Sequence, residues 1–241
     1  MQSFIDFLTE EAEAKHAVLA YGRMNPPTIG HAQVIDTVAR SAAGGDYFVF
    51  VSQTQDIKKN PLDYATKVKF IKAMFPQQAN HVVYDPSIKT IIQVAQWLYT
   101  KGYRSVTMVA GSDRLDSFKE LLEKYNGVKS PNGYYQFDSI NFVSSGDRDP
   151  DGDGLAGVSA TAARAAAKAD NLESFAQATG AGDLAKPLFH AVRKGLLAEH
   201  IVKHGSGYRL VSKKTGKIKI ERKYFPALKH YHIKEQLADN V

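Results

Sequence analysis

Three residues of types that bind phosphate, Thr28, Gly30 and His31, lie between an apolar segment and a segment with helical periodicity. The N–H groups that begin a helix carry partial positive charge, and Gly30 lets the backbone approach an anion closely. The side chains of Thr28 and His31 add donors there, and Pro26 and Pro27 restrict the loop, so we expect preorganised donors. Taken alone, this motif is more typical of a capped turn whose histidine bonds its own loop.

A second motif of the same kind, G-V-S-A-T-A-A-R, occupies residues 157–164 and opens an alanine-rich segment. Ser159 and Thr161 are the candidate caps of the helix predicted there. Ser159 and Arg164 are separated by about one and a half turns, so they do not share a strict face. The first-turn N–H groups, Thr161 and Arg164 can still converge on one polyphosphate. An ordinary capped helix with an exposed arginine is the alternative.

The elements predicted around these motifs place both at one edge of a parallel sheet. Apolar segments rich in Val, Ile, Phe and Tyr alternate with helical patterns, which is typical of an α/β fold. The carboxyl ends of such strands share an edge, and ligands bind there. Expected strands span 16–21, 46–52, 81–84, 105–110 and 139–143, and expected helices span 31–43, 62–75, 87–101, 114–125 and 171–178.

Two motifs in these positions resemble the nucleotidylyltransferase superfamily, whose members carry T-x-G-H after the first strand and (I/V)-S-x-T-x-x-R after the fifth. The resemblance covers about residues 15–170 and implies a Rossmann-like five-stranded parallel sheet with order 3-2-1-4-5. The opening G-R-M-N-P-P-T-x-G-H is similar to that of adenylyltransferases that make NAD. It is closer still to nucleotidyltransferase-like proteins of large tailed bacteriophages, which also resemble residues 60–76 and 148–160.

The resemblance implies attack by an acceptor on the α-phosphorus of a nucleoside triphosphate, with release of pyrophosphate. His31 and Thr28 would hold the transferred phosphate, and Arg164 the β- and γ-phosphates, as the catalytic residues. Mg²⁺ would travel with the triphosphate, without a metal site made by the protein. The A-G-S-D-R segment at 110–114 resembles the family's G-x-D, which would place Asp113 near the acceptor nucleotide. The implied nucleotide-binding residues are Gly22, Arg23, Met24, Gly30, Gly111, Asp113, Val158, Ser159 and Thr161.

Four lysines after the second predicted strand divide into two pairs. Lys58 and Lys59 face the predicted ligand edge and are candidate phosphate contacts, with a solvated surface pair as the alternative. Lys67 and Lys69 lie in an amphipathic helical pattern and are predicted to be on the surface.

Adenylyl transfer from ATP to nicotinamide mononucleotide, a step of NAD synthesis, is the preferred interpretation of the substrates. Cytidylyl transfer from CTP is next, because no residue matches the aromatic side chain that stacks on nicotinamide, and Trp97 is predicted to be core. The alternative class is a nucleic-acid-binding or virion-packaged phage protein with little small-molecule turnover. Superfamily members are often oligomeric, so a homo-oligomer is compatible with either.

Charge and composition distinguish the two ends of the chain. Residues 1–14 carry four acidic side chains and no Lys or Arg, whereas residues 186–241 carry 13 basic and four acidic ones, within a chain of net charge +6. Aromatic residues interleave with the C-terminal charge, as nucleic-acid binding would need; a solvated basic appendage is the alternative. The chain has no cysteine for disulfides and no apolar run approaching the ~18 residues of a membrane helix.

The predicted organisation is a leader (1–14), a nucleotidylyltransferase domain (15–183) and a basic α+β appendage (184–241). Within the appendage we expect a helix over 183–202 and a hairpin over 207–221 that turns at 214–216. The leader resembles those of internal phage head proteins, which are cut by a maturation protease; the site here would follow Glu10. The expected location is therefore the cytoplasm of an infected bacterial host, with packaging in the virion head as an alternative.

The Asp-rich loop D-R-D-P-D-G-D-G (147–154) does not match a calcium-binding EF-hand. That pattern requires Glu at loop position 12, and the two starting points tested place Val158 or Ala160 there. We expect a mobile lid before the second motif, or a solvated polar loop.

Overall fold

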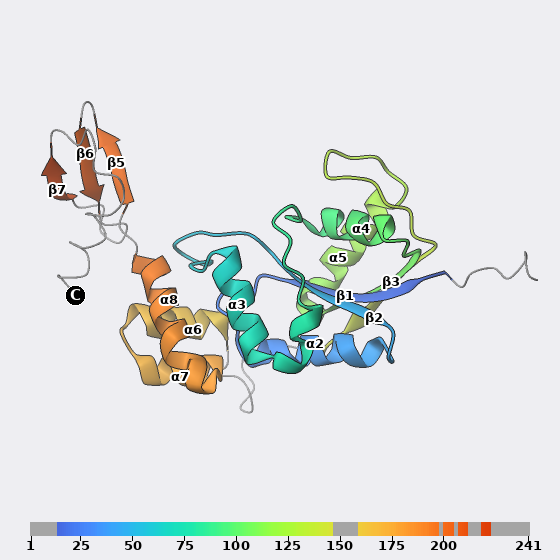
Figure 1. Ribbon diagram of the computed structural model, residues 1–241, viewed down its shortest axis with the longest axis horizontal. Coiled ribbons are helices and arrows are strands. Elements are labelled where there is room, and N and C mark those ends of the chain that lie inside the picture. The colour runs from blue at the N-terminus through green and yellow to red at the C-terminus, as the bar shows by residue number, and fades with distance from the viewer. Residues whose placement is uncertain (1–13, 147–158, 198–199, 205–206, 212–217, 223–241) are drawn as a thin grey trace, which may run out of the picture.

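Four parallel strands form the main sheet of this computed structural model, which describes residues 14–146, 159–197, 200–204, 207–211 and 218–222. The strand order is β2-β1-β3-β4, and Figure 1 labels the first three of these strands. The register pairs Gly22 with Val51 at the ends of β1 and β2, so the loops that follow share an edge. The predicted α/β class and parallel sheet are confirmed. The strands are β1 (His16–Gly22), β2 (Asp46–Val51), β3 (Ser105–Ala110) and β4 (Ser139–Ser144).

The third predicted strand, at residues 81–84, is wrong as a full strand. It makes a single parallel bridge, between Val82 and Val49 of β2, in which the Val83 N–H donates to the Val49 carbonyl at 3.0 Å. A 3₁₀ helix, η1 (Pro76–His81), takes up the residues before Val82, and Pro86 follows shortly after. The segment thus lies beside β2, where the order 3-2-1-4-5 would put it, but it is too short to extend the sheet.

Helices cover both faces of the sheet (Figure 1). The helices α4 (Ile91–Thr100) and α5 (Ser112–Tyr125) form one core cluster with Leu19 of β1. On the opposite face, α2 (Gly30–Ser41) packs against Val18, and α3 (Tyr64–Met74) packs near Val49. Because neighbouring residues of β1 are buried on opposite faces, its apolar run is continuous rather than alternating. The four helices predicted here are confirmed, with ends displaced by a few residues.

Three further helices follow the sheet and share a separate core around Phe175 and Leu188. They are α6 (Ala160–Lys168), α7 (Leu172–Thr179) and α8 (Ala185–Leu197), with a 3₁₀ turn, η2 (Gly182–Leu184), before α8. Asn171 caps α7 by accepting from the Ser174 N–H at 2.9 Å, and Gly180 ends that helix in the left-handed conformation.

The predicted helix over 183–202 is wrong at its C-terminal end. Helix α8 stops at Leu197, and β5 (His200–His204) instead joins an antiparallel sheet with β6 (Gly207–Val211) and β7 (Ile218–Arg222), in the order β5-β6-β7. The backbone of β5 makes its hydrogen bonds with β6. Since β6 lies outside the segment with the helical pattern, that pattern could not reveal the pairing. The pairing of β6 with β7 confirms the predicted hairpin.

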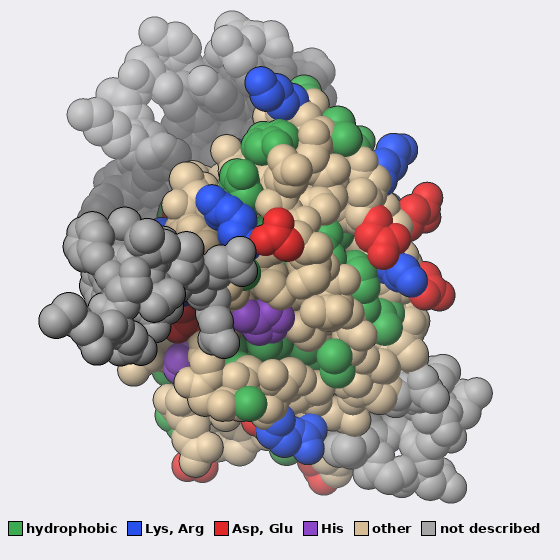
Figure 2. Space-filling view, turned by 90° about the vertical axis from the view of Figure 1, so that its right-hand side faces the viewer, with side chains coloured by type: hydrophobic (Ala, Val, Ile, Leu, Met, Phe, Trp, Pro, Cys, Tyr) green, Lys and Arg blue, Asp and Glu red, His purple; other side chains and the backbone are tan. Residues whose placement is uncertain are grey.

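Several predictions fall outside the described residues. These are the leader up to residue 13, the Asp-rich loop with Val158, the turn at 214–216 and everything after 222. Within the described part, no helix is long and apolar enough to cross a bilayer. Figure 2 views the molecule from the side where β1 begins, and there positive and negative side chains are interspersed without a concentrated patch of either sign.

Candidate active site at the carboxyl edge of the sheet

Thr28 and His31 contact each other in the loop that follows β1. Both are buried, with exposed fractions of 2% and 8%. The Thr28 N–H donates to His31 Nδ1 at 3.0 Å, and the Thr28 hydroxyl lies 2.9 Å from the same nitrogen. Although the Thr28 carbonyl is also 3.3 Å away, a backbone N–H can only donate, so the shorter contact makes Nδ1 an acceptor. A neutral His31 ring therefore carries its proton on Nε2.

The hydrogen bond from the Thr28 N–H to His31 Nδ1 is the one expected of a histidine whose role is only to stabilise its own loop. The same bond fixes the ring orientation and makes Nε2 a donor, which a phosphate-binding histidine requires. Gly30 begins α2, whose first-turn N–H groups start beside this ring. The structure is thus compatible with both interpretations of the first motif taken alone, and the surrounding residues must distinguish them.

The first-motif loop is held in place from three sides. The Gly22 carbonyl accepts from the Ser52 N–H at 2.8 Å. The buried Asn25 amide donates to the Leu62 carbonyl and accepts from the Leu62 N–H, each at 3.0 Å. The Ile29 N–H donates to the Thr179 carbonyl at the end of α7 at 2.7 Å. These bonds fix the loop before any ligand binds.

Met24 lies within the same loop and is also fully enclosed. Its side chain is 3% exposed and its backbone has a φ of 42°, in the left-handed region that residues other than glycine seldom adopt. The packed neighbours of Met24 therefore determine this part of the loop against its intrinsic preference.

Arg164 connects the second motif to the first. Its Nη1 donates to the Asn25 carbonyl at 2.8 Å, and its Nη2 donates to the Thr161 hydroxyl at 3.0 Å. Ser159 caps α6 by accepting from the Ala162 N–H at 3.0 Å. The two motifs, predicted to meet at the sheet edge, are therefore in direct contact.

The electrostatics of Arg164 favour an anion at this contact. Burial lowers the pKa of its guanidinium, and the nearby charge of Arg23 lowers it further, whereas Asp56 acts in the opposite direction. Arg23 itself is exposed. Two cations that repel each other gain from a polyanion placed between them.

Lys58 and Lys59 lie in the loop after β2, where their backbone N–H groups donate to Asp56 Oδ1 at 2.8 and 2.6 Å. The bond from the Lys59 N–H, followed by those from the Asn60 amide and the Lys58 N–H, lowers the pKa of Asp56 to about 2. Both lysine side chains are exposed. The structure places them at the same edge of the sheet, but no described hydrogen bond joins their ammonium groups to Thr28, His31 or Arg164.

Gly111 and Asp113 lie at the end of β3. Gly111 caps α5, and a Cβ atom added to it would lie 2.8 Å from Asp113 Oδ1. The absence of a side chain at Gly111 therefore lets the exposed Asp113 carboxylate sit over the start of the helix. The structure describes no hydrogen bond between Asp113 and the residues of the two motifs.

The prediction that Lys67 is on the surface is wrong. Its side chain is fully buried, and its ammonium group donates to the Ser52 carbonyl at the end of β2. Burial lowers the pKa of Lys67 to about 8, although the charge of Asp63 partly opposes this shift. Lys67 lies on the same side of α3 as Phe70 and Ile71, which is the signal that could have revealed it. The exposed Lys69 agrees with its prediction.

Lys67 stabilises the backbone at the end of β2, next to the candidate site. The Ser52 backbone is held on one side by Gly22 and on the other by Lys67, while the buried Ser52 hydroxyl makes no hydrogen bond within the described residues. This arrangement fixes the point at which the loop carrying Asp56, Lys58 and Lys59 leaves the sheet.

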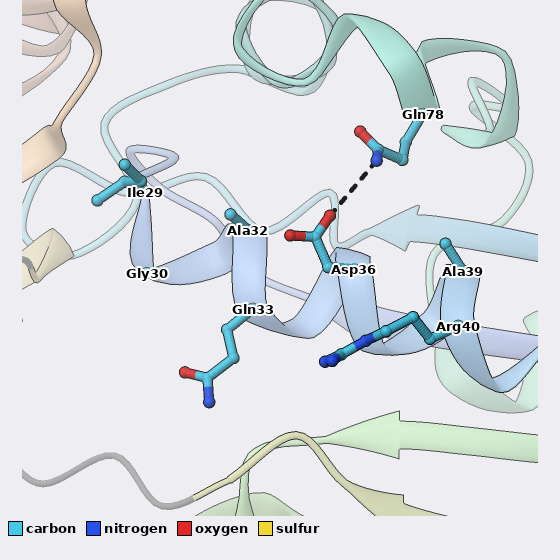
Figure 3. Close-up of a pocket in the computed structure, with 8 residues that line it drawn as sticks. All are labelled: Ile29, Gly30, Ala32, Gln33, Asp36, Ala39, Arg40 and Gln78. Atoms are coloured by element: carbon cyan, nitrogen blue, oxygen red, sulfur yellow. Dashed lines mark hydrogen bonds between the residues drawn. The ribbon is translucent and has the colours of Figure 1, made fainter.

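A surface hollow lies along α2 (Figure 3), and its lining includes neither Asn25 nor Arg164. The Gln78 amide donates to Asp36 at 3.4 Å across it, and Gln33 and Arg40 project from the helix on another side. Gly30 is the one predicted site residue in its lining, which comprises Ile29, Gly30, Ala32, Gln33, Asp36, Ala39, Arg40 and Gln78. The hollow therefore coincides neither with the pair formed by Thr28 and His31 nor with the contact of Arg164 with Asn25.

Comparison with known proteins identifies the family. The family model described as "Cytidylyltransferase-like" matches residues 19–147, and no curated protein matches the chain. Among solved structures, a protein of Vibrio parahaemolyticus designated nicotinate-nucleotide adenylyltransferase is similar, with 16% identity and a TM-score of 0.44 over 72% of this chain and 98% of that one. Since the family model spans more than half of the sequence, this protein belongs to the cytidylyltransferase-like family of nucleotidylyltransferases.

Proposed function

We propose that this protein transfers the AMP group of ATP to nicotinamide mononucleotide and releases pyrophosphate. The observation that carries the proposal is the hydrogen bond from Arg164 to the Asn25 carbonyl, which unites the two phosphate-binding motifs. The similarity of G-R-M-N-P-P-T-x-G-H to the adenylyltransferases that make NAD supports ATP and nicotinamide mononucleotide as the substrate pair.

In the proposed reaction, an oxygen of the acceptor's phosphate attacks the α-phosphorus of ATP. The new P–O bond forms as the bond from the α-phosphorus to the bridging oxygen breaks, and pyrophosphate leaves with that electron pair. His31 would donate through Nε2 to the α-phosphate, with its ring held by Thr28. Arg164 and Arg23 would neutralise the charge that develops on the departing phosphates. Catalysis then consists of positioning and charge stabilisation.

The proposed donor substrate is ATP with Mg²⁺ bound to its phosphates. Within the described ranges, no group of three or more His, Asp or Glu residues could hold a metal ion. The Asp56 carboxylate already accepts backbone N–H groups in its own turn. Mg²⁺ binds phosphate oxygens readily and keeps several waters, so we propose that it enters with the nucleotide.

The test is pyrophosphate release in the presence of Mg²⁺, with ATP, CTP, GTP and UTP each combined with nicotinamide mononucleotide and other phosphate-bearing acceptors. His31→Ala should abolish most of the release. His16→Ala is the matched control, because His16 begins β1 at the edge of the sheet opposite to the loop of His31, and there it contacts Ser105 and Thr107.

Release that requires ATP and nicotinamide mononucleotide, and that falls only in His31→Ala, would support the proposal. Release with CTP alone would replace it by cytidylyl transfer. No release with any pair, from protein that still binds a nucleotide, would contradict a small-molecule transferase and favour a nucleic-acid-binding role.

A further inference from the structure

The segment that contains the three-stranded sheet β5-β6-β7 concentrates the positive charge of the chain. Residues 200–222 contain seven Lys or Arg residues and one Glu, a net charge of +6. The chain as a whole also has a net charge of +6, so the rest of the sequence is balanced. The nucleotidyl transfer proposed above assigns no task to this segment.

The strand register brings two cationic residues and one aromatic residue into a single row. Lys203 of β5 pairs with Tyr208 of β6, and Tyr208 pairs with Arg222 of β7. Residues directly opposite one another are the nearest neighbours on an antiparallel sheet. Because neighbouring strands lie about 4.8 Å apart, the backbone positions of Lys203 and Arg222 are separated by about 10 Å, with that of Tyr208 between them.

The row two positions along on the same strands is apolar, since Ile201 pairs with Leu210, and Leu210 with Ile220. The intervening row belongs to the other face, because positions along a strand alternate. That row contains Val202, Arg209 and Glu221, in which Arg209 pairs with an opposite charge. Lys219 of β7 falls at the register shift between Leu210 and Val211 and belongs to neither row. Lys203 and Arg222 thus share a row that contains no acidic residue, and we name the face with Lys203, Tyr208 and Arg222 the Tyr208 face.

We propose that the Tyr208 face binds single-stranded nucleic acid. Lysine and arginine contact phosphates without sequence preference, and an aromatic residue between them offers a surface on which one base can stack. A duplex, whose bases already stack on each other, cannot use Tyr208 in this way. An acidic polypeptide could satisfy the two cations but has no base to place against the aromatic residue.

The experiment measures binding of the full chain to a fluorescein-labelled 20-nucleotide oligo(dT) by anisotropy, between 50 and 200 mM salt. Lys203→Gln/Arg222→Gln should weaken binding at least tenfold at low salt. The slope of log affinity against log salt should also decrease in magnitude by about 1.4, because each phosphate contact on a single strand contributes about 0.7. Lys213→Gln/Lys214→Gln removes the same charge from outside the described strands and should leave the slope unchanged.

Two substitutions of Tyr208 test the stacking contact independently of charge. Tyr208→Ala should weaken binding about fivefold or more, whereas Tyr208→Phe, which keeps the ring, should bind as the wild type does. Far-UV circular dichroism compares the folding of all variants. If Lys203→Gln/Arg222→Gln fails to fold, the difference between the Ala and Phe variants at Tyr208 decides the question.

Equal losses in both double variants would overturn the proposal in favour of bulk charge. It would also be overturned by tighter binding to a 20-base-pair duplex, by displacement with polyglutamate at the same charge concentration, or by no binding at 50 mM salt. Pyrophosphate release should be the same in wild type and in Lys203→Gln/Arg222→Gln. The proposed enzyme and the proposed nucleic-acid surface can therefore fail separately.

Discussion

The guanidinium of Arg164 donates a hydrogen bond of 2.8 Å to the backbone carbonyl of Asn25, across 139 positions of the chain. Asn25 in turn uses its side chain to hold the backbone of Leu62. One arginine thus couples α6, the helix after β4, to the loop after β1, and through Asn25 to the loop after β2. This junction is where the proposed triphosphate would be bound.

Substitution of Arg164 should impair catalysis beyond its effect on stability. Arg164→Ala removes both the forked bond to Asn25 and Thr161 and the cation, so we expect pyrophosphate release to fall by about 10²–10³-fold. Arg164→Lys keeps the charge but not the fork and should be intermediate. The control is Arg193→Gln, which breaks contacts with Asp170 and the Ala167 carbonyl away from the motifs. Comparable activity losses in Arg193→Gln and Arg164→Ala would contradict a catalytic role for Arg164.

Thr28 and His31 should differ strongly in their effects on rate. His31→Ala removes the proposed phosphate donor and should cost about 10²–10³-fold. Thr28→Val removes the hydroxyl 2.9 Å from Nδ1 but keeps the Thr28 N–H that holds the ring, so the expected loss is about fivefold, as for one hydrogen bond. Steady-state pyrophosphate release measures both. A loss in Thr28→Val as large as that in His31→Ala would show that the hydroxyl itself contacts the phosphate.

The sequence predicts that the two motifs lie close together, but it does not predict which atoms of the two motifs contact each other. Alternating strands and helices require the loops after β1 and β4 to share an edge, and this general rule was enough to relate Thr28 and His31 to residues 157–164. The bond from Arg164 to Asn25 joins a side chain to a backbone carbonyl across the fold. No periodicity or spacing encodes such a contact.

Two of the errors in the prediction also arise from contacts with other elements, and the third arises from the segment directly before the predicted strand. A lysine in an amphipathic pattern is normally assigned to solvent, yet Lys67 reaches the carbonyl of Ser52 in the interior. Residues 200–202 continue a helical pattern, yet they pair with β6. Residues 81–84 are of types that favour a β-strand, but the preceding 3₁₀ helix leaves room for only one bridge to β2.

Lys67 should make the stability of the protein depend on pH above neutrality. Its pKa is about 8 in the folded protein and 10.5 when unperturbed, so between these values the unfolded chain binds more protons. Stability should then rise with pH across this window, by about 3 kcal/mol in total. Urea unfolding of wild type and Lys67→Met at pH 7.5 and 10 measures this, and the rise should be absent from Lys67→Met.

The control for Lys67 is Lys69→Met, two residues along the same helix and exposed. It should retain the wild-type pH dependence, because an exposed ammonium group keeps its hydration when the chain folds. A pH dependence that persists unchanged in Lys67→Met would show that Lys67 is not the group that loses its proton.

Gly180 should couple the first-motif loop to the helices that follow the sheet. Its φ of +61° disfavours other residues, and an added Cβ would lie 2.8 Å from Ile29 Cγ2, next to the bond from the Ile29 N–H to Thr179. Gly182 is the matched control, because it has a φ of +54° and open space where a Cβ would be. Gly182→Ala should cost only the backbone strain of about 1–2 kcal/mol.

Gly180→Ala should cost at least 1 kcal/mol more than Gly182→Ala, because it adds a steric conflict to the same strain. Since the conflict pushes on Ile29, which lies beside Gly30 and His31, pyrophosphate release should also fall in Gly180→Ala and not in Gly182→Ala. Thermal unfolding and initial rates on the two variants measure these effects. If both variants lose stability equally and neither loses activity, the contact between Ile29 and Gly180 has no part in holding the loop.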